Sequence, residues 1–109
     1  MSTIDDAVYL YLTTKGRKTG RDREIEIWFT ELEGRYYLIS EKRDEAHWVQ
    51  NLRRERRVRF RVGDKQYAGM AHPLDGAEDD DLAERVRRLS DAKYGWSAGL
   101  VVELRPDRR

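Results

Sequence analysis

The chain has 109 residues, and 39% of them are charged, but 22 basic and 21 acidic side chains leave a formal net charge of only +1. This near balance argues against a general polyanion binder, which carries a large positive excess. The sequence has no cysteine, which excludes disulfides and thiolate metal sites, and no apolar run approaches the roughly 20 residues of a membrane-spanning helix.

The first part of the chain predicts three strands. Residues 8–14 are rich in aromatic and aliphatic side chains, residues 24–30 alternate strictly at first, and residues 35–40 follow a tight turn at Glu33-Gly34. In the second of these segments, Ile25 and Ile27 share one face with Phe29. Short turns between strands favour antiparallel pairing.

The second part alternates helices with strands. Asp44 is the expected N-cap of the first helix, and the apolar stripe of the second is formed by Leu82, Val86 and Leu89. The predicted elements are a helix over about 45–54, paired strands over 57–62 and 65–72, a helix over about 78–93 and a strand over 100–104.

These elements predict a mainly β fold with two helices, in the α+β class. About six mostly antiparallel strands would close a small barrel that the helices plug or flank. We expect a single domain over 1–109, with an ordered core at about 8–104 and a flexible tail over 106–109. Cytoplasmic residence is the default expectation because no signal-peptide pattern is present.

The segment between the first two strands carries the clearest functional signal. Residues 15–23 contain two glycines, a threonine and five basic side chains, without the pattern of a P-loop or of Gly-x-Gly-x-x-Gly. One interpretation is a solvated hairpin turn. The other is an anion cradle, in which the N–H groups of Lys18 to Gly20 and the Thr19 hydroxyl bind a phosphate. Arg23 is either a second contact or a surface partner of Glu26 or Glu41.

Three motifs in a fixed order are similar to a known family. They are Leu12-Thr13-Thr14-Lys15-Gly16-Arg17-Lys18-Thr19-Gly20 followed by Arg23, then Trp48-Val49-Gln50-Asn51-Leu52 with Val58, and finally Tyr94 and Trp96 before the last strand. Together they resemble the deazaflavin-dependent nitroreductase family, within the flavin-binding split β-barrel, pyridoxamine-phosphate-oxidase-like group. The resemblance extends from about Tyr9 to Leu104.

The resemblance implies a split β-barrel that works as a homodimer and binds a deazaflavin coenzyme of the 8-hydroxy-5-deazaflavin type or flavin mononucleotide (FMN). It implies an oxidoreductase that passes hydride from the reduced cofactor to a small-molecule acceptor, either quinone-like or nitro-substituted. The candidate cofactor-binding residues are Arg17, Lys18, Thr19, Gly20, Arg23, Ser40, Lys42, Trp48 and Asn51. A structural role stays open for four of them. Ser40 and Lys42 could form an ordinary strand end, Trp48 could pack the helix onto the barrel, and Asn51 could bond neighbouring backbone.

The candidate acceptor pocket consists of Trp28, His47, Tyr94 and Trp96. The aromatic members could instead belong to the core or to a dimer interface. His47 and His72 are the only side chains that titrate near neutrality, and no carboxylate stands at metal-ligand spacing from them. No metal site is therefore predicted.

Two alternative functions remain open at this stage. The short connection over 41–46 is consistent with a non-catalytic protein that only binds or carries the cofactor. The alternating run that contains Arg59 and Arg61 is compatible with single-stranded nucleic acid. Glu55 and the small net charge argue against nucleic acid, and the acids over 79–81 offer these arginines partners within the protein.

Overall fold

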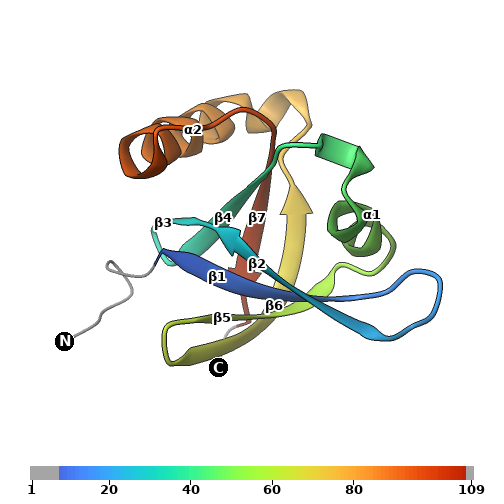
Figure 1. Ribbon diagram of the computed structural model, residues 1–109. Coiled ribbons are helices and arrows are strands. Elements are labelled where there is room, and N and C mark those ends of the chain that lie inside the picture. The colour runs from blue at the N-terminus through green and yellow to red at the C-terminus, as the bar shows by residue number, and fades with distance from the viewer. Residues whose placement is uncertain (1–7, 108–109) are drawn as a thin grey trace.

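A computed structural model describes residues 8–107 of the chain (Figure 1). A single sheet has the strand order β2-β1-β5-β6-β7-β4-β3, and all neighbouring strands are antiparallel. The strands are β1 (Tyr9–Lys15), β2 (Asp22–Trp28), β3 (Thr30–Leu32), β4 (Arg35–Ser40), β5 (Arg57–Val62), β6 (Lys65–Pro73) and β7 (Leu100–Pro106). The helices are α1 (His47–Arg54) and α2 (Asp80–Tyr94), preceded by the short 3-10 turns η2 (Arg43–Glu45) and η3 (Ala77–Asp79). The sheet curls into a half-barrel, which confirms the predicted fold class.

The sheet changes edge at Phe29. The single strand predicted over 24–30 is two strands, because β2 and β3 lie at opposite edges of the sheet with only Phe29 between them. The Phe29 side chain is buried in the barrel. Its N–H donates to the Tyr94 hydroxyl at 3.1 Å, and its carbonyl lies 2.9 Å from the same hydroxyl oxygen. The backbone at this point is therefore satisfied by α2 and not by a strand ladder, so the barrel stays open between β2 and β3.

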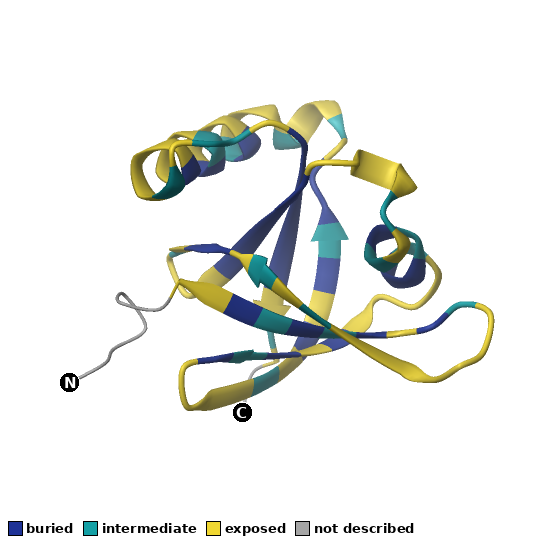
Figure 2. Ribbon diagram, viewed as in Figure 1, coloured by how far each residue is buried: buried dark blue, intermediate teal, exposed yellow. Residues whose placement is uncertain are grey.

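The interior of the half-barrel is filled by the alternating apolar faces of its strands and by α1 (Figure 2). Helix α1 places Val49 and Leu52 inward, and neither side chain is exposed. Inward residues from β1 and β5 meet them at strand spacing. These residues are Leu10 and Leu12 on β1 and Val58, Phe60 and Val62 on β5.

A second apolar cluster lies on the outer face of β4 and β7, beneath α2. Tyr37 and Ile39 point outward to this cluster, while Tyr36 and Leu38 point into the barrel. Because side chains on both faces of β4 are buried, the sequence of this strand is a nearly continuous apolar run. On α2 the buried positions are Ala83, Val86 and Ser90, whereas Leu89 is 37% exposed. The predicted stripe was therefore wrong at Leu89.

The predicted ends of two elements also differ from the structure. Helix α1 begins at His47 with Ala46 as its N-cap, so Asp44 does not cap it. Asp44 lies in η2, and its carboxylate accepts a hydrogen bond from Arg53 Nε at 2.6 Å. Strand β7 reaches Pro106, and the Asp107 N–H donates to the Ala68 carbonyl at 2.8 Å. The predicted flexible tail is thus held up to Asp107, and residues 108 and 109 lie outside the described residues.

One charged side chain, Glu103 on β7, is completely buried on the outer face of the sheet. Its carboxylate accepts hydrogen bonds from the Tyr37 hydroxyl at 2.8 Å, from Arg105 Nε at 2.5 Å and from Arg35 Nη1 at 3.3 Å. Burial alone would raise the pKa of Glu103, but the hydrogen bonds from Arg105 and Tyr37 and the two positive charges hold it below its usual value. Glu103 is therefore charged in the folded protein.

We expect Glu103→Gln to lower the free energy of unfolding by about 2 kcal/mol, measured by urea denaturation at neutral pH. The loss is smaller than for a fully enclosed ion pair because Arg35 and Arg105 are half-exposed. Arg85 and Glu33 form an exposed pair, so Glu33→Gln is a matched control that should change the stability by less than about 0.5 kcal/mol. Equal losses in the two variants would contradict a special role for Glu103.

The same residue predicts a pH dependence. The folded-state pKa of Glu103 is lower than its unfolded value, so its contribution is fully present above about pH 4.3 and is lost as the pH falls through the folded-state pKa. Between roughly pH 4 and pH 2, the stability of the parent protein should fall more steeply than that of Glu103→Gln. Parallel curves for the two proteins would show that Glu103 is not ionised in the fold.

Candidate functional site

Two cavities lie on the open side of the half-barrel, and Trp48 on α1 lines both of them. The first, which we call the basic cavity, has a volume of about 470 Å³ and lies under the loop between β1 and β2. The second, the aromatic groove, has a volume of about 680 Å³ and lies between β2, β4 and α1. Because they share Trp48, the two cavities form one elongated site with chemically different ends.

Most of the predicted cofactor-binding residues meet in the basic cavity. Its lining includes Arg17, Lys18, Thr19, Arg23, Trp48 and Asn51. His47, which we had assigned to the acceptor pocket, also lies here and not in the aromatic groove. The side chains come from the loop after β1, the first residues of β2 and helix α1. The sequence motifs therefore converge in space.

The loop itself is a tight turn closed by its own backbone. The Gly16 N–H donates to the Arg21 carbonyl at 2.7 Å, and the Gly20 N–H donates to the Gly16 carbonyl at 2.8 Å. A Cβ at Gly16 would lie only 3.0 Å from the Arg21 carbonyl oxygen, and Gly20 has a φ of +73°, so both positions favour glycine. The Gly20 N–H is therefore committed within the loop and is not available to a ligand, unlike in the predicted cradle.

The three other donors of the cradle remain available. In the described residues, the N–H groups of Lys18 and Thr19 have no acceptor within the protein. The Thr19 hydroxyl accepts a hydrogen bond from the Arg21 N–H at 3.2 Å, which leaves its own proton free to be donated. The anion-binding capacity of the loop is thus carried by residues 18 and 19.

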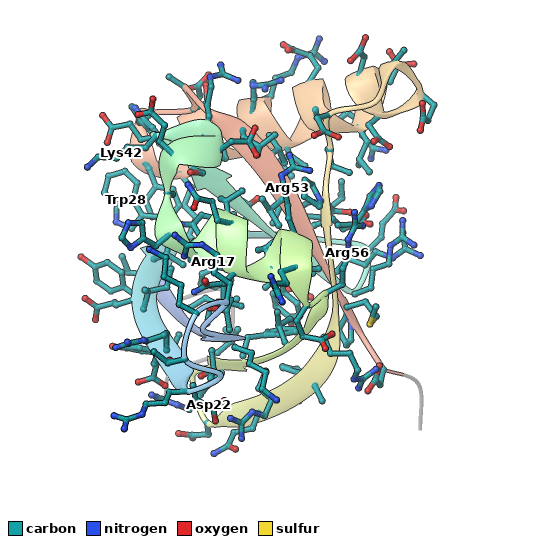
Figure 3. All side chains as sticks on the ribbon, turned by 90° about the vertical axis from the view of Figure 1, so that its right-hand side faces the viewer. Arg17, Asp22, Trp28, Lys42, Arg53 and Arg56 are labelled. Atoms are coloured by element: carbon teal, nitrogen blue, oxygen red, sulfur yellow. The ribbon has the colours of Figure 1, made fainter. Side chains whose placement is uncertain are left out.

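Asn51 fixes the position of this loop from the buried side of α1. Its Oδ1 accepts hydrogen bonds from the Arg17 N–H at 3.1 Å and from Arg17 Nη1 at 3.0 Å. Its Nδ2 donates to the Thr14 hydroxyl at 3.2 Å, and both Asn51 and Thr14 are buried. Figure 3 shows Arg17 beside α1. Asn51 therefore connects strand, loop and helix, and positions the loop.

The basic cavity keeps its positive charge. Within residues 8–107, no ion pair joins Arg17, Lys18 or Arg23 to a carboxylate. The surface pairs considered for Arg23 with Glu26 and Glu41 are not formed. The one carboxylate in the lining, Glu24, faces Arg61 at 3.8 Å. The cavity therefore suits an anionic group such as a phosphate.

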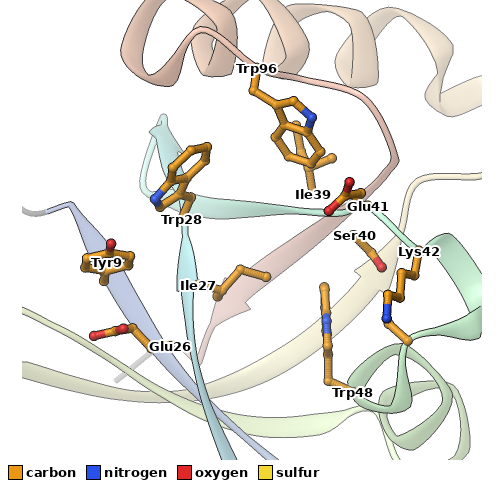
Figure 4. Close-up of a pocket in the computed structure, with 11 residues that line it drawn as sticks. Tyr9, Glu26, Ile27, Trp28, Ile39, Ser40, Glu41, Lys42, Trp48 and Trp96 are labelled. Carbon is orange, nitrogen blue, oxygen red and sulfur yellow. The ribbon is translucent and has the colours of Figure 1, made fainter.

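Indole rings dominate the aromatic groove (Figure 4). Trp28 and Trp96 lie on one side of it and Trp48 on the other, with Ile27 and Ile39 between them. These large, flat, apolar surfaces suit a planar ring system.

Tyr94, predicted for the acceptor pocket, does not line the groove but supports it from behind. Its ring stacks on Trp28 with centroids 4.4 Å apart and planes 5° apart. Burial raises the pKa of Tyr94, so its hydroxyl stays protonated near neutral pH. The Trp96 ring contacts the Trp28 ring edge to face, with the ring centroids 6.2 Å apart. The orientation of Trp28 is thus fixed by the residues behind it.

Ser40 and Lys42 line the wall of the groove at the end of β4. Ser40 is buried, and its hydroxyl donates to the Arg43 carbonyl at 2.9 Å, which stabilises the turn into η2. Lys42 is exposed at the rim. Sequence reasoning missed six further residues of the lining, namely Tyr9, Glu26, Ile27, Ile39, Glu41 and Ala46. The pairing of Tyr9 with Trp28 across β1 and β2 could have indicated the first of them.

The arginines that suggested nucleic acid are neutralised within the protein. Arg59 pairs with Asp22, Arg61 faces Glu24, and Arg57 binds Asp107. The partners come from β2, on the far side of β1, and from the residue that follows β7, and not from the acids over 79–81 that the sequence had suggested. A basic stripe free to bind phosphates is therefore not present along β5.

Residues 8–107 contain neither a candidate membrane-spanning helix nor a candidate metal-binding cluster. No helix in this part is long and apolar enough to cross a membrane. Nor does this part bring three or more His, Asp or Glu side chains close enough to hold a metal ion.

Comparison with known proteins places the chain among cofactor-dependent reductases. A family model described as F420H(2)-dependent quinone reductase matches residues 2–99. Among curated proteins, none matches the sequence significantly. A solved F420-H2-dependent reductase (FDR-A) is 25% identical with a TM-score of 0.62, and the alignment covers 89% of this chain and 93% of that one.

Other solved structures share the fold at lower identity. The heme storage protein HutZ from Vibrio cholerae has a TM-score of 0.79 at 14% identity, covering 97% of this chain and 86% of its own. A putative pyridoxamine 5'-phosphate oxidase from Listeria innocua has a TM-score of 0.73 at 16% identity, covering 96% and 88%. These similarities confirm the split-barrel architecture.

We expect Asn51→Ala to release the loop between β1 and β2. The free energy of unfolding should fall by about 1–3 kcal/mol, since buried hydrogen-bonding groups lose their partner. In amide exchange followed by NMR, the Arg17 amide should exchange about tenfold faster or more, whereas Leu12 in β1 should change far less.

Gln50→Ala provides the control on the same helix. The Gln50 side chain donates to the Asp44 carbonyl at 2.9 Å on the exposed side, away from the loop. Its removal should leave exchange of the Arg17 amide unchanged. If Asn51→Ala and Gln50→Ala behaved alike, Asn51 would not position the loop.

Proposed function

The chain belongs to the F420H(2)-dependent quinone reductase family, and we propose that its elongated site binds the reduced deazaflavin coenzyme and reduces a quinone-like acceptor. The family is one of deazaflavin-dependent oxidoreductases, so the predicted cofactor is the deazaflavin and not FMN. The observation that supports the proposal most strongly is that a basic cavity and an aromatic groove meet at Trp48.

The residues present fit such a cofactor. The aromatic groove is in the size range of small-molecule sites, and its indole walls suit a flat tricyclic ring. The basic cavity supplies charge from Arg17, Lys18 and Arg23, together with the N–H groups of residues 18 and 19, to an anionic tail. A ligand that is planar at one end and anionic at the other matches both halves of the site.

We assign roles to the residues on this basis. Lys18 and Thr19 would bind phosphate oxygens directly, and Arg23 would add a forked donor from the start of β2. Arg17 would contribute through its partly tethered guanidinium, and Asn51 would act only by positioning it. Trp48 would separate the ring end from the tail end. Gly20 would shape the turn without contacting the ligand.

When bound, the reduced deazaflavin would supply a hydride, that is two electrons and one proton, and the quinone would take a second proton from solvent to become a hydroquinone. The protein would orient the acceptor against Trp28 and Trp96 and exclude water from the apolar part of the groove. Ser40 would hold the wall of the groove through its bond to Arg43. A nitro compound is the alternative acceptor.

We also propose a homodimer. Val8, Tyr9 and Trp28 are 49%, 42% and 39% exposed, and Tyr9 and Trp28 pair across β1 and β2 beside the mouth of the groove. A second copy would cover this apolar surface. One structurally similar protein is described as a domain-swapped dimer.

We expect Lys18→Ala to weaken binding of the deazaflavin coenzyme by about 1–3 kcal/mol, because one charge-assisted contact to phosphate is lost. This corresponds to about a 5- to 150-fold rise in Kd, which a titration of the cofactor fluorescence would measure. The control is Lys65→Ala, which removes an equal charge from the exposed β5–β6 turn. Identical affinity in Lys18→Ala and Lys65→Ala would mean that the loop is only a turn.

Turnover tests the function itself. With reduced deazaflavin as donor, the protein should oxidise the cofactor when a naphthoquinone is added, at a rate that depends on protein concentration. Binding of the coenzyme without turnover of quinones or nitroaromatics would refute the reductase and favour the cofactor-carrier alternative. Absence of coenzyme binding would refute both.

A further inference from the structure

We propose that Glu26 gives the aromatic groove a charge preference, so that it accepts neutral or cationic planar acceptors and disfavours anionic ones. This inference rests on the proposed function, because it concerns the acceptor of the same site. It depends on how the carboxylates of β2 are paired. None of the motifs that indicated the family includes Glu26.

Strand β2 carries three acidic side chains at every second position. Asp22 pairs with Arg59, and Glu24 faces Arg61 at 3.8 Å, so a guanidinium offsets each of these two charges. Glu26 differs, because its hydrogen-bond partner is the neutral hydroxyl of Tyr11, which donates to Oε2 at 2.6 Å. Of the three, only Glu26 lines the aromatic groove. A carboxylate without an ion-pair partner therefore lies at the edge of the groove, beside Tyr9 (Figure 4).

Tyr11 holds this carboxylate in place. The Arg61 guanidinium lies over the Tyr11 ring, 4.3 Å from its centroid. The hydrogen bond with Glu26 raises the pKa of Tyr11, so the hydroxyl remains a donor at neutral pH. A fixed carboxylate exerts a more directional field than a freely rotating one.

The other charges of the groove do not cancel that of Glu26. Glu41 and Lys42 are adjacent residues on the opposite wall and have opposite signs (Figure 4). The positive residues of the basic cavity lie beyond Trp48. Glu26 therefore leaves the groove with a net negative charge, and because Glu26 is exposed, its effect on a ligand depends on the salt concentration.

The test compares three acceptors that share a ring system: a naphthoquinone, its ring sulfonate and its quaternary-ammonium derivative. For each protein, kcat/KM is divided by the value for the neutral compound, so that intrinsic reactivity cancels between variants. In Glu26→Gln, the relative value for the sulfonate should rise about fivefold or more, and that for the ammonium compound should fall. The preference of the parent protein should shrink at high salt.

Two further variants separate charge from structure. Glu31→Gln removes the same charge from β3, outside the groove, and should leave the ratios as in the parent protein. Tyr11→Phe removes the hydrogen bond but keeps the carboxylate, and should retain the preference against the sulfonate. If Tyr11→Phe reproduced the effect of Glu26→Gln, the role of Glu26 would be structural and the proposal would fail.

A binding measurement makes the proposal independent of turnover. Quenching of tryptophan fluorescence by the same three compounds, without cofactor, should show that Glu26→Gln binds the sulfonate more tightly than the parent protein does, binds the ammonium compound less tightly and binds the neutral compound equally well. The basic cavity is the same in both proteins, so its attraction for the sulfonate cancels in this comparison. Affinities that Glu26→Gln leaves unchanged would overturn the charge preference. Absence of turnover together with the expected changes in affinity would instead refute the reductase and leave the charge preference standing.

Discussion

The hydroxyl of Tyr94 holds the chain at Phe29, and the open side of the barrel depends on this contact. At Phe29 the sheet passes from one edge to the other, and the backbone there is bonded by the end of α2. Lys93 adds a hydrogen bond from Nζ to the Phe29 carbonyl at 2.9 Å, with its ammonium over the Phe29 ring. A ladder between β2 and β3 would close the barrel, whereas this anchor keeps the two strands apart and creates the groove. The same tyrosine stacks on Trp28 and orients it.

The two ends of the resulting site differ in charge. The basic cavity keeps three unpaired cationic side chains, whereas the aromatic groove keeps the carboxylate of Glu26. Elsewhere the arginines of β5 are paired with carboxylates from neighbouring segments. The two ends of the site therefore carry charges of opposite sign that have no ion-pair partner within the described residues. This separation matches a ligand with an anionic tail and an acceptor without negative charge.

The sequence predicted the strands, both helices and the convergence of the loop motif with α1, because these follow from local periodicity and from motif order. It did not predict that Phe29 would divide one strand into two, since the cause is a contact with Tyr94, far away in the chain. Asp44 resembled an N-cap by type and position but is used by Arg53 across the surface. Gly20 looked like a free donor, and only the closed turn reveals that its N–H is occupied. Tertiary contacts, which a local pattern does not contain, decided each of these cases.

A crystal structure of the protein with the oxidised deazaflavin coenzyme would test the account most directly. The account predicts that the ring system lies in the aromatic groove beside Trp48 and that a phosphate oxygen lies within hydrogen-bond distance of the Lys18 or Thr19 N–H. A coenzyme bound with its phosphate away from the loop, for example against Arg59 and Arg61 on the outer face of β5, would contradict the assignment of both cavities.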